Sequence, residues 1–144
     1  MIPVIDLKSE TALQQIEQAY TTIGFAVFTN YFTPQEQTTY HTWFDTMKQF
    51  FELDLETKQR YPYEGDTNLG YSVMGAENVD PTAPKDLKES FNYNNTRMGD
   101  HLWPELEGFK TLATETVNIA DRLTLRLMTR FDKILGRPDM PLTH

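Results

Sequence analysis

Histidines and carboxylates are the residues of this chain that could support acid–base or metal chemistry. The 144 residues include three histidines, His41, His101 and His144. His41 and Asp45 are four residues apart and would share a helix face, but two side chains are too few for a metal site. No His-x-Asp or His-x-Glu pair occurs, so no single strand can supply two ligands of a facial iron site. We therefore expect His41 to be a surface or partly buried residue, with no metal-binding and no catalytic residue in this chain.

Other common catalytic patterns are also missing from the sequence. The chain contains no cysteine, which excludes a disulfide scaffold, a thiolate metal site and a cysteine nucleophile. Ser72 and Ser90 have no histidine base nearby in sequence, and the glycines match no phosphate-binding fingerprint. The acidic residues of the second helical region are simplest to interpret as solvated charge (Asp45, Glu52, Asp54 and Glu56). The residues alone predict no complete catalytic apparatus.

Composition and charge indicate one globular domain over residues 1–144. Hydrophobic residues make up 39% of the chain, which is enough for a packed core. The net charge of −8 disfavours nucleic acids and anionic membranes as partners, because both are negatively charged. The start "MIPVIDLKSE" does not resemble a signal peptide, and no apolar run has the length of a membrane span. We expect a cytoplasmic protein with no nucleic-acid or membrane partner.

The first thirty residues predict a strand, a helix and a second strand. Residues 2–7 alternate as a short strand, and apolar residues recur at helical spacing over residues 10–23. Gly24 follows at the position where helices often end. The segment "GFAVFTN" then predicts a buried strand over residues 25–29.

The next helix has the clearest start signal. Thr33 is a candidate N-cap, Pro34 suits the first helical position, and Glu36 completes a capping box. The expected apolar stripe of this helix consists of Tyr40, Trp43, Phe44, Met47, Phe50 and Phe51.

The second half of the chain predicts a loop, a strand and a long helix. "LDLETKQRY" indicates a helical turn, and the glycines and prolines of residues 61–85, Pro81 included, indicate a long loop with a short strand near Tyr71. Residues 86–95 predict a strand, and residues 108–135 a helix that Gly136 and Pro138 end. The fold class is α+β. Three short strands need further partners to form a stable sheet, so exposed strand edges could drive oligomerisation.

The segment "DLKESFNYNN" combines charge with aromatic residues. Phe91 and Tyr93 are two apart, as on one face of a strand, and Lys88 and Glu89 precede them. The two charges either anchor the start of the strand through ion pairs or discourage strand pairing as solvated edge residues. The tyrosines of the loop and strand either pack under the loop or form a pocket wall (Tyr61, Tyr63, Tyr71 and Tyr93).

Six segments, taken in order, resemble one protein family. They are "IPVIDL", "GFAVFTN", "FFELDLETKQRY", "LGY", "DLKESFNYN" and "WPELEGFK". The series resembles the N-terminal region of the isopenicillin N synthase-like family of non-haem, 2-oxoglutarate- and Fe(II)-dependent dioxygenases, across nearly the whole chain. The segment "DLKESF" resembles the family most specifically of the six.

The resemblance implies an N-terminal region whose helices pack on a few strands of a double-stranded β-helix, or jelly roll. In this family the C-terminal half carries a His-x-Asp pair, a later His and an Arg-x-Ser pair, which bind Fe(II) and 2-oxoglutarate. The present residues contain none of these motifs. The expected partners are therefore a small-molecule substrate and a C-terminal jelly-roll half, on the same or a second polypeptide. Neither cofactor is expected to bind this chain alone.

The resemblance also suggests substrate-binding positions. It places "ESFNYNN" at the pocket, with Tyr93 as the substrate-facing aromatic residue and Glu89 and Asn95 as weaker candidates. Tyr71 of "LGY" and Asn30 of "FTN" are further candidates. We expect Phe91 to point into the core and the opposite face of the strand to meet the substrate.

Three interpretations remain open from the sequence. The chain can be the N-terminal part of an oxygenase, including one subunit of a split enzyme. It can be a stand-alone, non-catalytic binding or assembly module. It can also be an ordinary small α+β protein outside this family.

Overall fold

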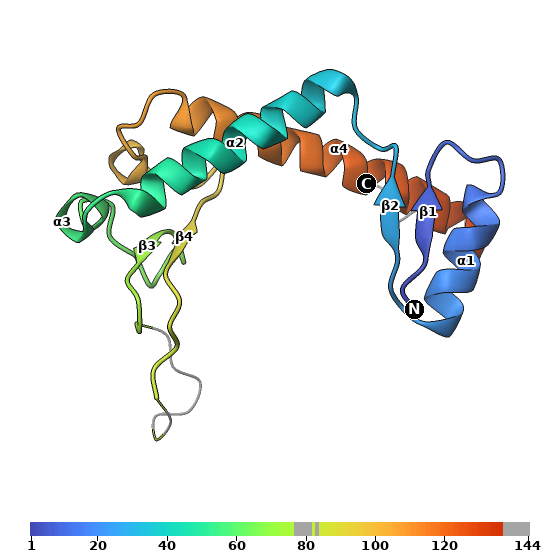
Figure 1. The fold of residues 1–144 in the computed structure, drawn as a ribbon, viewed down its shortest axis with the longest axis horizontal. Helices are drawn as coiled ribbons and strands as arrows, with labels where there is room; N and C mark the ends of the chain where they lie inside the picture. The colour runs from blue at the N-terminus through green and yellow to red at the C-terminus, as the bar shows by residue number, and fades with distance from the viewer. Residues whose placement is uncertain (77–81, 83, 137–144) are drawn as a thin grey trace. The chain divides into compact units, whose positions relative to one another are not determined.

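The computed structural model describes residues 1–76, 82 and 84–136. Pro81, Pro138 and His144 lie outside these residues. The chain divides into two compact units: unit 1 comprises Met1–Tyr40 and Val117–His144, and unit 2 comprises His41–Thr116. Helices α2 (Pro34–Glu52) and α4 (Phe109–Leu135) each contribute residues to both units (Figure 1).

Unit 1 contains a two-stranded parallel sheet with a crossover helix. Strand β1 (Val4–Asp6) pairs with β2 (Val27–Thr29), with Ile5 opposite Phe28. Parallel strands need a crossover, and α1 (Ala12–Thr22) supplies it beside the two strands (Figure 1). Gly24 has φ +81° and donates its N–H to the Ala19 carbonyl at 3.0 Å, so the predicted glycine end of this helix is confirmed.

The core of unit 1 is small. Ile5, Ala12, Ile16 and Ala19 are buried, and the partly buried side chains packed against them are Leu7, Ala26, Phe28, Leu127, Phe131 and Ile134. The strand predicted over residues 25–29 is confirmed as β2, but it begins later, at Val27, and its predicted burial is wrong, because Phe25 is 68% and Val27 49% exposed. Within the described residues β2 pairs with β1 alone, whereas buried parallel strands are covered on both faces.

Helix α2 begins with the predicted capping box. The Thr33 N–H donates to Glu36 Oε2 at 2.7 Å, and the Glu36 N–H donates to Thr33 Oγ1 at 3.2 Å. The prediction of Phe44 in the apolar stripe is wrong, because this side chain is 69% exposed. Phe44 follows the buried Trp43 by one residue, which turns it about 100° around the helix axis.

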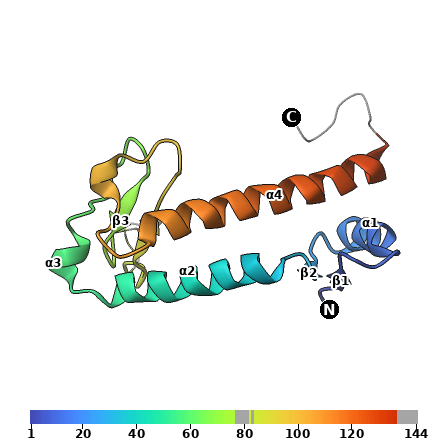
Figure 2. The ribbon, with the colours of Figure 1, turned by 90° about the horizontal axis from the view of Figure 1, so that it is seen from above.

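Unit 2 holds the remaining elements. They are α3 (Leu55–Lys58), β3 (Gly70–Ser72), β4 (Ser90–Asn92), the 3₁₀ helix η1 (Asp100–Leu102) and the first residues of α4. After α2 the chain passes through α3 and returns as β3 (Figure 2). Strands β3 and β4 are antiparallel, with Tyr71 opposite Phe91. The short strand near Tyr71 is confirmed, and the predicted strand over residues 86–95 is reduced to three residues.

Phe50 is the centre of the unit 2 core. Its fully buried ring lies 5.0 Å from the Phe91 ring, 5.5 Å from Phe109 and 5.9 Å from Tyr71. Most of these ring pairs meet edge to face, a geometry that aromatic side chains favour. The prediction that Phe91 points into the core is confirmed.

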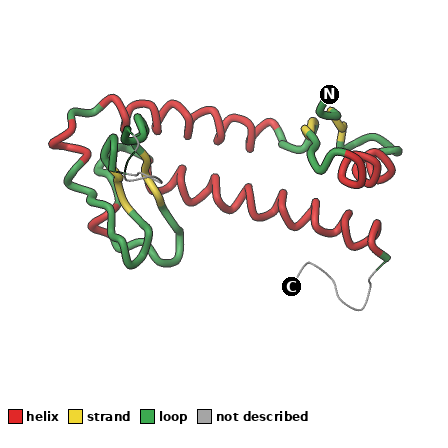
Figure 3. Tube along the Cα trace, turned by 90° about the horizontal axis from the view of Figure 1, so that it is seen from below, coloured by secondary structure: helices red, strands yellow, loops and turns green. Residues whose placement is uncertain are grey.

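The observed class is α+β, and strand occupies only short segments (Figure 3). The predicted long helix is confirmed as α4, and Gly136 follows it with φ +60°. Within the described part of the chain, no helix combines the length and apolar character that crossing a membrane requires.

Candidate functional site

An ion pair between a buried lysine and a partly buried glutamate holds the segment that leads into β4. The Lys58 Nζ donates to Glu89 Oε2 at 2.8 Å and to the Phe51 carbonyl at 3.0 Å. The Tyr71 hydroxyl donates a hydrogen bond to the same Glu89 oxygen. Since Lys58 belongs to α3 and Tyr71 to β3, Glu89 joins three elements of unit 2.

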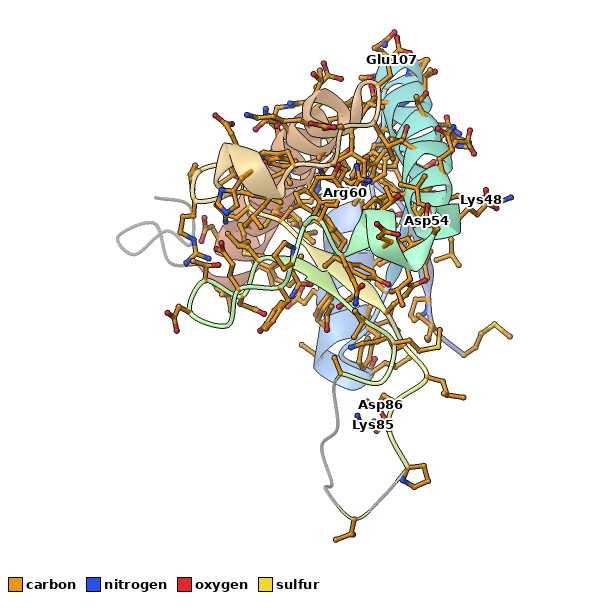
Figure 4. All side chains as sticks on the ribbon, turned by 90° about the vertical axis from the view of Figure 1, so that its left-hand side faces the viewer. Lys48, Asp54, Arg60, Lys85, Asp86 and Glu107 are labelled. Carbon is orange, nitrogen blue, oxygen red and sulfur yellow. The ribbon has the colours of Figure 1, made fainter. Side chains whose placement is uncertain are left out.

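The position of Lys58 follows from the start of its helix. Asp54 caps α3 by accepting the Thr57 N–H at 2.8 Å, and Figure 4 shows Asp54 at the beginning of this helix. One turn later Lys58 enters the interior, where its side chain is 9% exposed against 21% for Glu89. Lys58 was not predicted from the sequence, because nothing in "LETK" distinguishes a buried lysine from a solvated one.

The contacts among Glu89, Lys58 and Tyr71 favour an ionised Glu89, a charged Lys58 and a protonated Tyr71. Burial opposes ionisation of Glu89, but the hydrogen bonds from Lys58 and Tyr71 outweigh it and lower the Glu89 pKa below 4.5. Burial also opposes the charge of Lys58, yet the hydrogen bond to Glu89 and the nearby Tyr71 raise the Lys58 pKa above 10.5. Burial and the Glu89 carboxylate raise the pKa of Tyr71, so its hydroxyl keeps the proton that it donates.

The expected ion-pair anchor is therefore confirmed for Glu89. The alternative, a solvated edge charge, is wrong for this residue. Lys88, the other predicted anchor, is exposed on the segment before β4. Figure 4 shows Lys85 and Asp86 farther back on the same segment.

Tyr93 packs among the aromatic residues of unit 2. Its ring lies 5.5 Å from Trp43, 6.0 Å from Trp103 and 6.5 Å from Phe91, and the residue is half-buried. It also lines a surface hollow described below. Tyr93 can therefore pack in the aromatic cluster and also form part of a pocket wall. Substrate contact by Tyr93 stays a prediction.

Asn95 connects the end of the β4 region to α4. Its Nδ2 donates to the Thr114 carbonyl at 3.3 Å. Its buried Oδ1 has no hydrogen-bond partner among the described residues. The observed contact supports a structural role, and substrate contact by Asn95 stays a prediction.

Asn30 lies in unit 1, whereas the other four predicted site residues lie in unit 2. It adopts φ +57°, and its Nδ2 donates to Asp6 Oδ2 at 2.8 Å. The backbone N–H of Lys8 and then this amide lower the pKa of Asp6. The observed contact of Asn30 holds the end of β2 to β1.

Tyr71 lines one hollow of unit 2, with a volume of about 320 Å³. The backbone of β3 lies close to that of residues 61–62 here, and the Tyr71 N–H donates to the Tyr61 carbonyl at 2.7 Å. Gly70 has φ +96°, and a Cβ at this position would lie 2.2 Å from the Pro62 carbonyl oxygen. Only glycine can therefore bring β3 this close to residues 61–62.

A second hollow of unit 2, which we call the polar hollow, has a volume of about 400 Å³. Its lining residues are Thr67, Asn68, Leu69, Phe91, Asn92, Tyr93, Asn94 and Arg97. The Asn92 Nδ2 donates to Asn68 Oδ1 at 3.1 Å and so ties the two sides of the hollow together.

The asparagines and Arg97 of the polar hollow were not predicted from the sequence. Strand alternation was an available signal for two of them. Successive side chains of a strand point to opposite faces. Because Phe91 points into the core, Asn92 and Asn94 are expected on the opposite face, and Tyr93 on the same face as Phe91. No sequence pattern pointed to Asn68, which the fold brings to β4 from the loop before β3.

The described residues do not fit an iron site. Among them, no three His, Asp or Glu side chains gather closely enough to hold a metal ion. His41 is exposed, and His101 Nε2 lies 3.0 Å from Glu64 Oε1 as an exposed pair. The Glu64 contact was not predicted, since the two residues are far apart in sequence.

Comparisons with known proteins agree on one family. Residues 2–113 match the family model described as "non-haem dioxygenase in morphine synthesis N-terminal". A curated relative, the proline hydroxylase buaE of Petromyces alliaceus, is 27% identical over 143 aligned residues, which cover 92% of this chain and 44% of that protein.

Solved structures show the same likeness. A full-length Neurospora crassa protein in complex with alpha-KG has a TM-score of 0.72 and 25% identity, covering 91% of this chain and 46% of that protein. The Neurospora crassa protein has also been solved with alpha-KG and thymine. A putative oxygenase of Shewanella oneidensis shares the fold, with a TM-score of 0.67 and 20% identity over 98% of this chain. The chain spans less than half the length of these relatives.

Proposed function

The chain belongs to the family of N-terminal domains of non-haem dioxygenases, and we propose that it forms the substrate-pocket part of a 2-oxoglutarate- and Fe(II)-dependent oxygenase. The complete enzyme would oxidise a small molecule with O2. The observation that carries this proposal is the family match over residues 2–113. The alpha-KG in the complex of the Neurospora crassa protein supports the cosubstrate.

The proposal divides the work between two halves of an enzyme. Because the described residues do not fit an iron site, we assign Fe(II) and 2-oxoglutarate to a C-terminal jelly-roll half. That half can lie on the same polypeptide or on a second one. The present chain would contribute binding and orientation of the substrate.

The rigid mounting of β4 supports the pocket role. Glu89 is held by Lys58 and Tyr71 just before the strand, and Asn95 is bonded to α4 after its end. Side chains that meet a substrate need such supports, because small displacements weaken binding and catalysis. Under this proposal Tyr93 would meet the substrate from the wall that these contacts hold.

Exposed apolar side chains of unit 1 support a covering partner. Val4 and Val27, which are paired across the sheet, are 65% and 49% exposed, and Phe25 is also exposed. A groove of about 310 Å³ in the same unit is lined largely by apolar residues, among them Leu7, Phe28 and Leu127. Apolar surface of this kind favours association, and the C-terminal half is the partner that the family suggests.

The proposal is tested by measuring succinate released from 2-oxoglutarate. The natural polypeptide that contains these residues would be assayed with Fe(II), O2 and either L-proline or thymine, the substrates suggested by its relatives. We expect substrate-dependent succinate from that polypeptide and none from the 144-residue chain alone. Failure to consume 2-oxoglutarate across a broad library of small molecules would contradict the proposal.

The same assay separates the alternative functions. If these residues are the whole natural product, succinate release that needs a second polypeptide indicates a split oxygenase. A stable assembly that never consumes 2-oxoglutarate indicates a non-catalytic module.

Tyr93 allows a finer test of the pocket role in the active enzyme. Tyr93→Phe keeps the ring that packs on Trp43 and removes only the hydroxyl. We expect a changed KM for the substrate with little change in thermal stability. Unchanged kinetics would remove Tyr93 from the substrate site.

A further inference from the structure

We propose that the polar hollow binds the carboxylate of the substrate, so that the substrate is a small carboxylic acid such as an amino acid. This inference rests on the proposed function, because it treats the hollow as part of the substrate pocket. It concerns the hydrogen-bond donors of Asn68, Asn94 and Arg97.

Hydrogen bonds inside the protein occupy the amide oxygens of two lining asparagines. Asn68 Oδ1 accepts from the Tyr63 hydroxyl at 2.9 Å and from Asn92 Nδ2 at 3.1 Å. Asn94 Oδ1 accepts from the backbone N–H groups of Thr96 and Arg97, each at 3.0 Å. The amide oxygens of Asn68 and Asn94 already accept hydrogen bonds, whereas their NH2 groups remain available as donors. The hollow therefore presents more donors than acceptors.

The residues that line the polar hollow carry a positive charge, although the chain as a whole is acidic. Arg97 lines it, whereas no Asp or Glu does. Within the described residues, no carboxylate forms an ion pair with the Arg97 guanidinium. The chain as a whole has a net charge of −8, so this lining departs from its surroundings. A guanidinium matches the two oxygens of a carboxylate and can bind both at once.

The size of the hollow suits a small organic acid. The volume of about 400 Å³ falls at the lower end of small-molecule pockets. The half-buried Tyr93 supplies carbon surface beside the donors, whereas Leu69 and Phe91 are almost fully buried. An amino acid presents a carboxylate to the donors and a carbon skeleton to this surface. A neutral base such as thymine has no carboxylate for the exposed Arg97 guanidinium to bind.

The test is a binding titration of the natural polypeptide followed by ¹⁵N nuclear magnetic resonance, without metal or turnover. The probes are two matched pairs, L-proline with L-prolinamide and acetate with acetamide. The observed signals are the side-chain NH2 groups of Asn68 and Asn94 and the Nε–H of Arg97. We expect saturable shifts of these signals with the acids, at least about tenfold tighter than with the amides.

Two arginine variants locate the effect. Arg97→Gln should bring the affinities for acid and amide to within about twofold of each other, since it removes the positive charge and the paired N–H donors of the guanidinium. Arg60→Gln is the matched control, because Arg60 is exposed in the same unit and does not line the hollow. It should leave the preference unchanged.

Each outcome decides the proposal. Equal affinities for acids and amides, or a preference for the acids that survives Arg97→Gln, would overturn it. Tighter binding of 2-oxoglutarate than of L-proline at the same signals would also overturn it, by making the hollow a cosubstrate site. Acid binding here without any succinate release would leave the carboxylate site intact and refute the oxygenase function.

Discussion

Units 1 and 2 differ in how far each completes its own interior. Unit 2 encloses Phe50, Phe91 and Phe109 with the rings around them, and it buries a lysine together with a carboxylate partner. Unit 1 has a smaller core, built largely from Ile5, Ile16 and two alanines. Its two-stranded sheet leaves Val4 and Val27 exposed.

The contrast suggests where a partner would bind under the proposed function. Unit 2 forms its aromatic core and the contact between Lys58 and Glu89 from its own residues. Unit 1 exposes apolar side chains on both of its strands, and under the proposed function a second half of an enzyme would cover them. The predictions below test this difference, from the largest expected effect to the smallest.

Phe50→Ala should cause the largest loss, about 3–5 kcal/mol of unfolding free energy, because it removes the centre of the unit 2 core. Unfolding in urea would be followed by tryptophan fluorescence, which reports on unit 2 since both tryptophans lie there. Phe44→Ala is the matched control on the same helix. This exposed side chain should change the free energy by no more than about 0.5 kcal/mol. Similar losses for the two variants would contradict the assigned core.

Glu89→Gln should come next, with a loss of about 2–3 kcal/mol, because it leaves the buried Lys58 charge uncompensated. The double variant Lys58→Met with Glu89→Gln removes both charges, keeps an acceptor for the Tyr71 hydroxyl and should recover most of that loss. An equal loss in the single and double variants would show that packing, and not charge pairing, holds the start of β4.

The same pair predicts a dependence of stability on pH. The Glu89 pKa is lowered below 4.5, so its stabilisation is present above pH 4.5 and is lost as pH falls through the lowered value. The Lys58 pKa is raised above 10.5, so its contribution is full below pH 10.5 and is lost at higher pH. The original chain should therefore lose more stability than the double variant on acidification from about pH 5 to about pH 3. Parallel unfolding curves for the two proteins would contradict the ion pair.

Thr33→Ala should have the smallest effect, about 1 kcal/mol, because it removes the capping oxygen of α2. Amide hydrogen exchange would locate the loss in the first turn of that helix, in unit 1. Thr33→Ser retains the hydroxyl and should keep the protection. Equal exchange in the alanine and serine variants would show that the hydroxyl contributes nothing to the cap.

Local signals in the sequence predicted much of the fold. The capping box of Thr33 and Glu36, the glycine after α1 and the bounds of α4 depend on residues close in sequence. The burial of β2 and the stripe position of Phe44 were predicted wrongly. Burial depends on what the rest of the chain places against a residue, and local patterns do not contain that information.

The site was predicted less completely than the fold. Glu89 was expected to form an ion pair, but its partner Lys58 comes from 31 positions earlier in the chain. Asn68 and Asn92 meet through a contact over 24 positions. Such pairs are brought together by the packing of α3, β3 and β4. No spacing in the sequence reveals them.

Our central claim is that these residues work as one half of an oxygenase. The most direct test is the intact mass of the protein as its native source produces it, compared with the 16.8 kDa of this chain. The chain covers 46% of the Neurospora crassa protein, so we predict a mass about twice as large, with a His-x-Asp pair, a later His and an Arg-x-Ser pair in the additional residues. A mass of 16.8 kDa, with no second polypeptide bound, would contradict the claim.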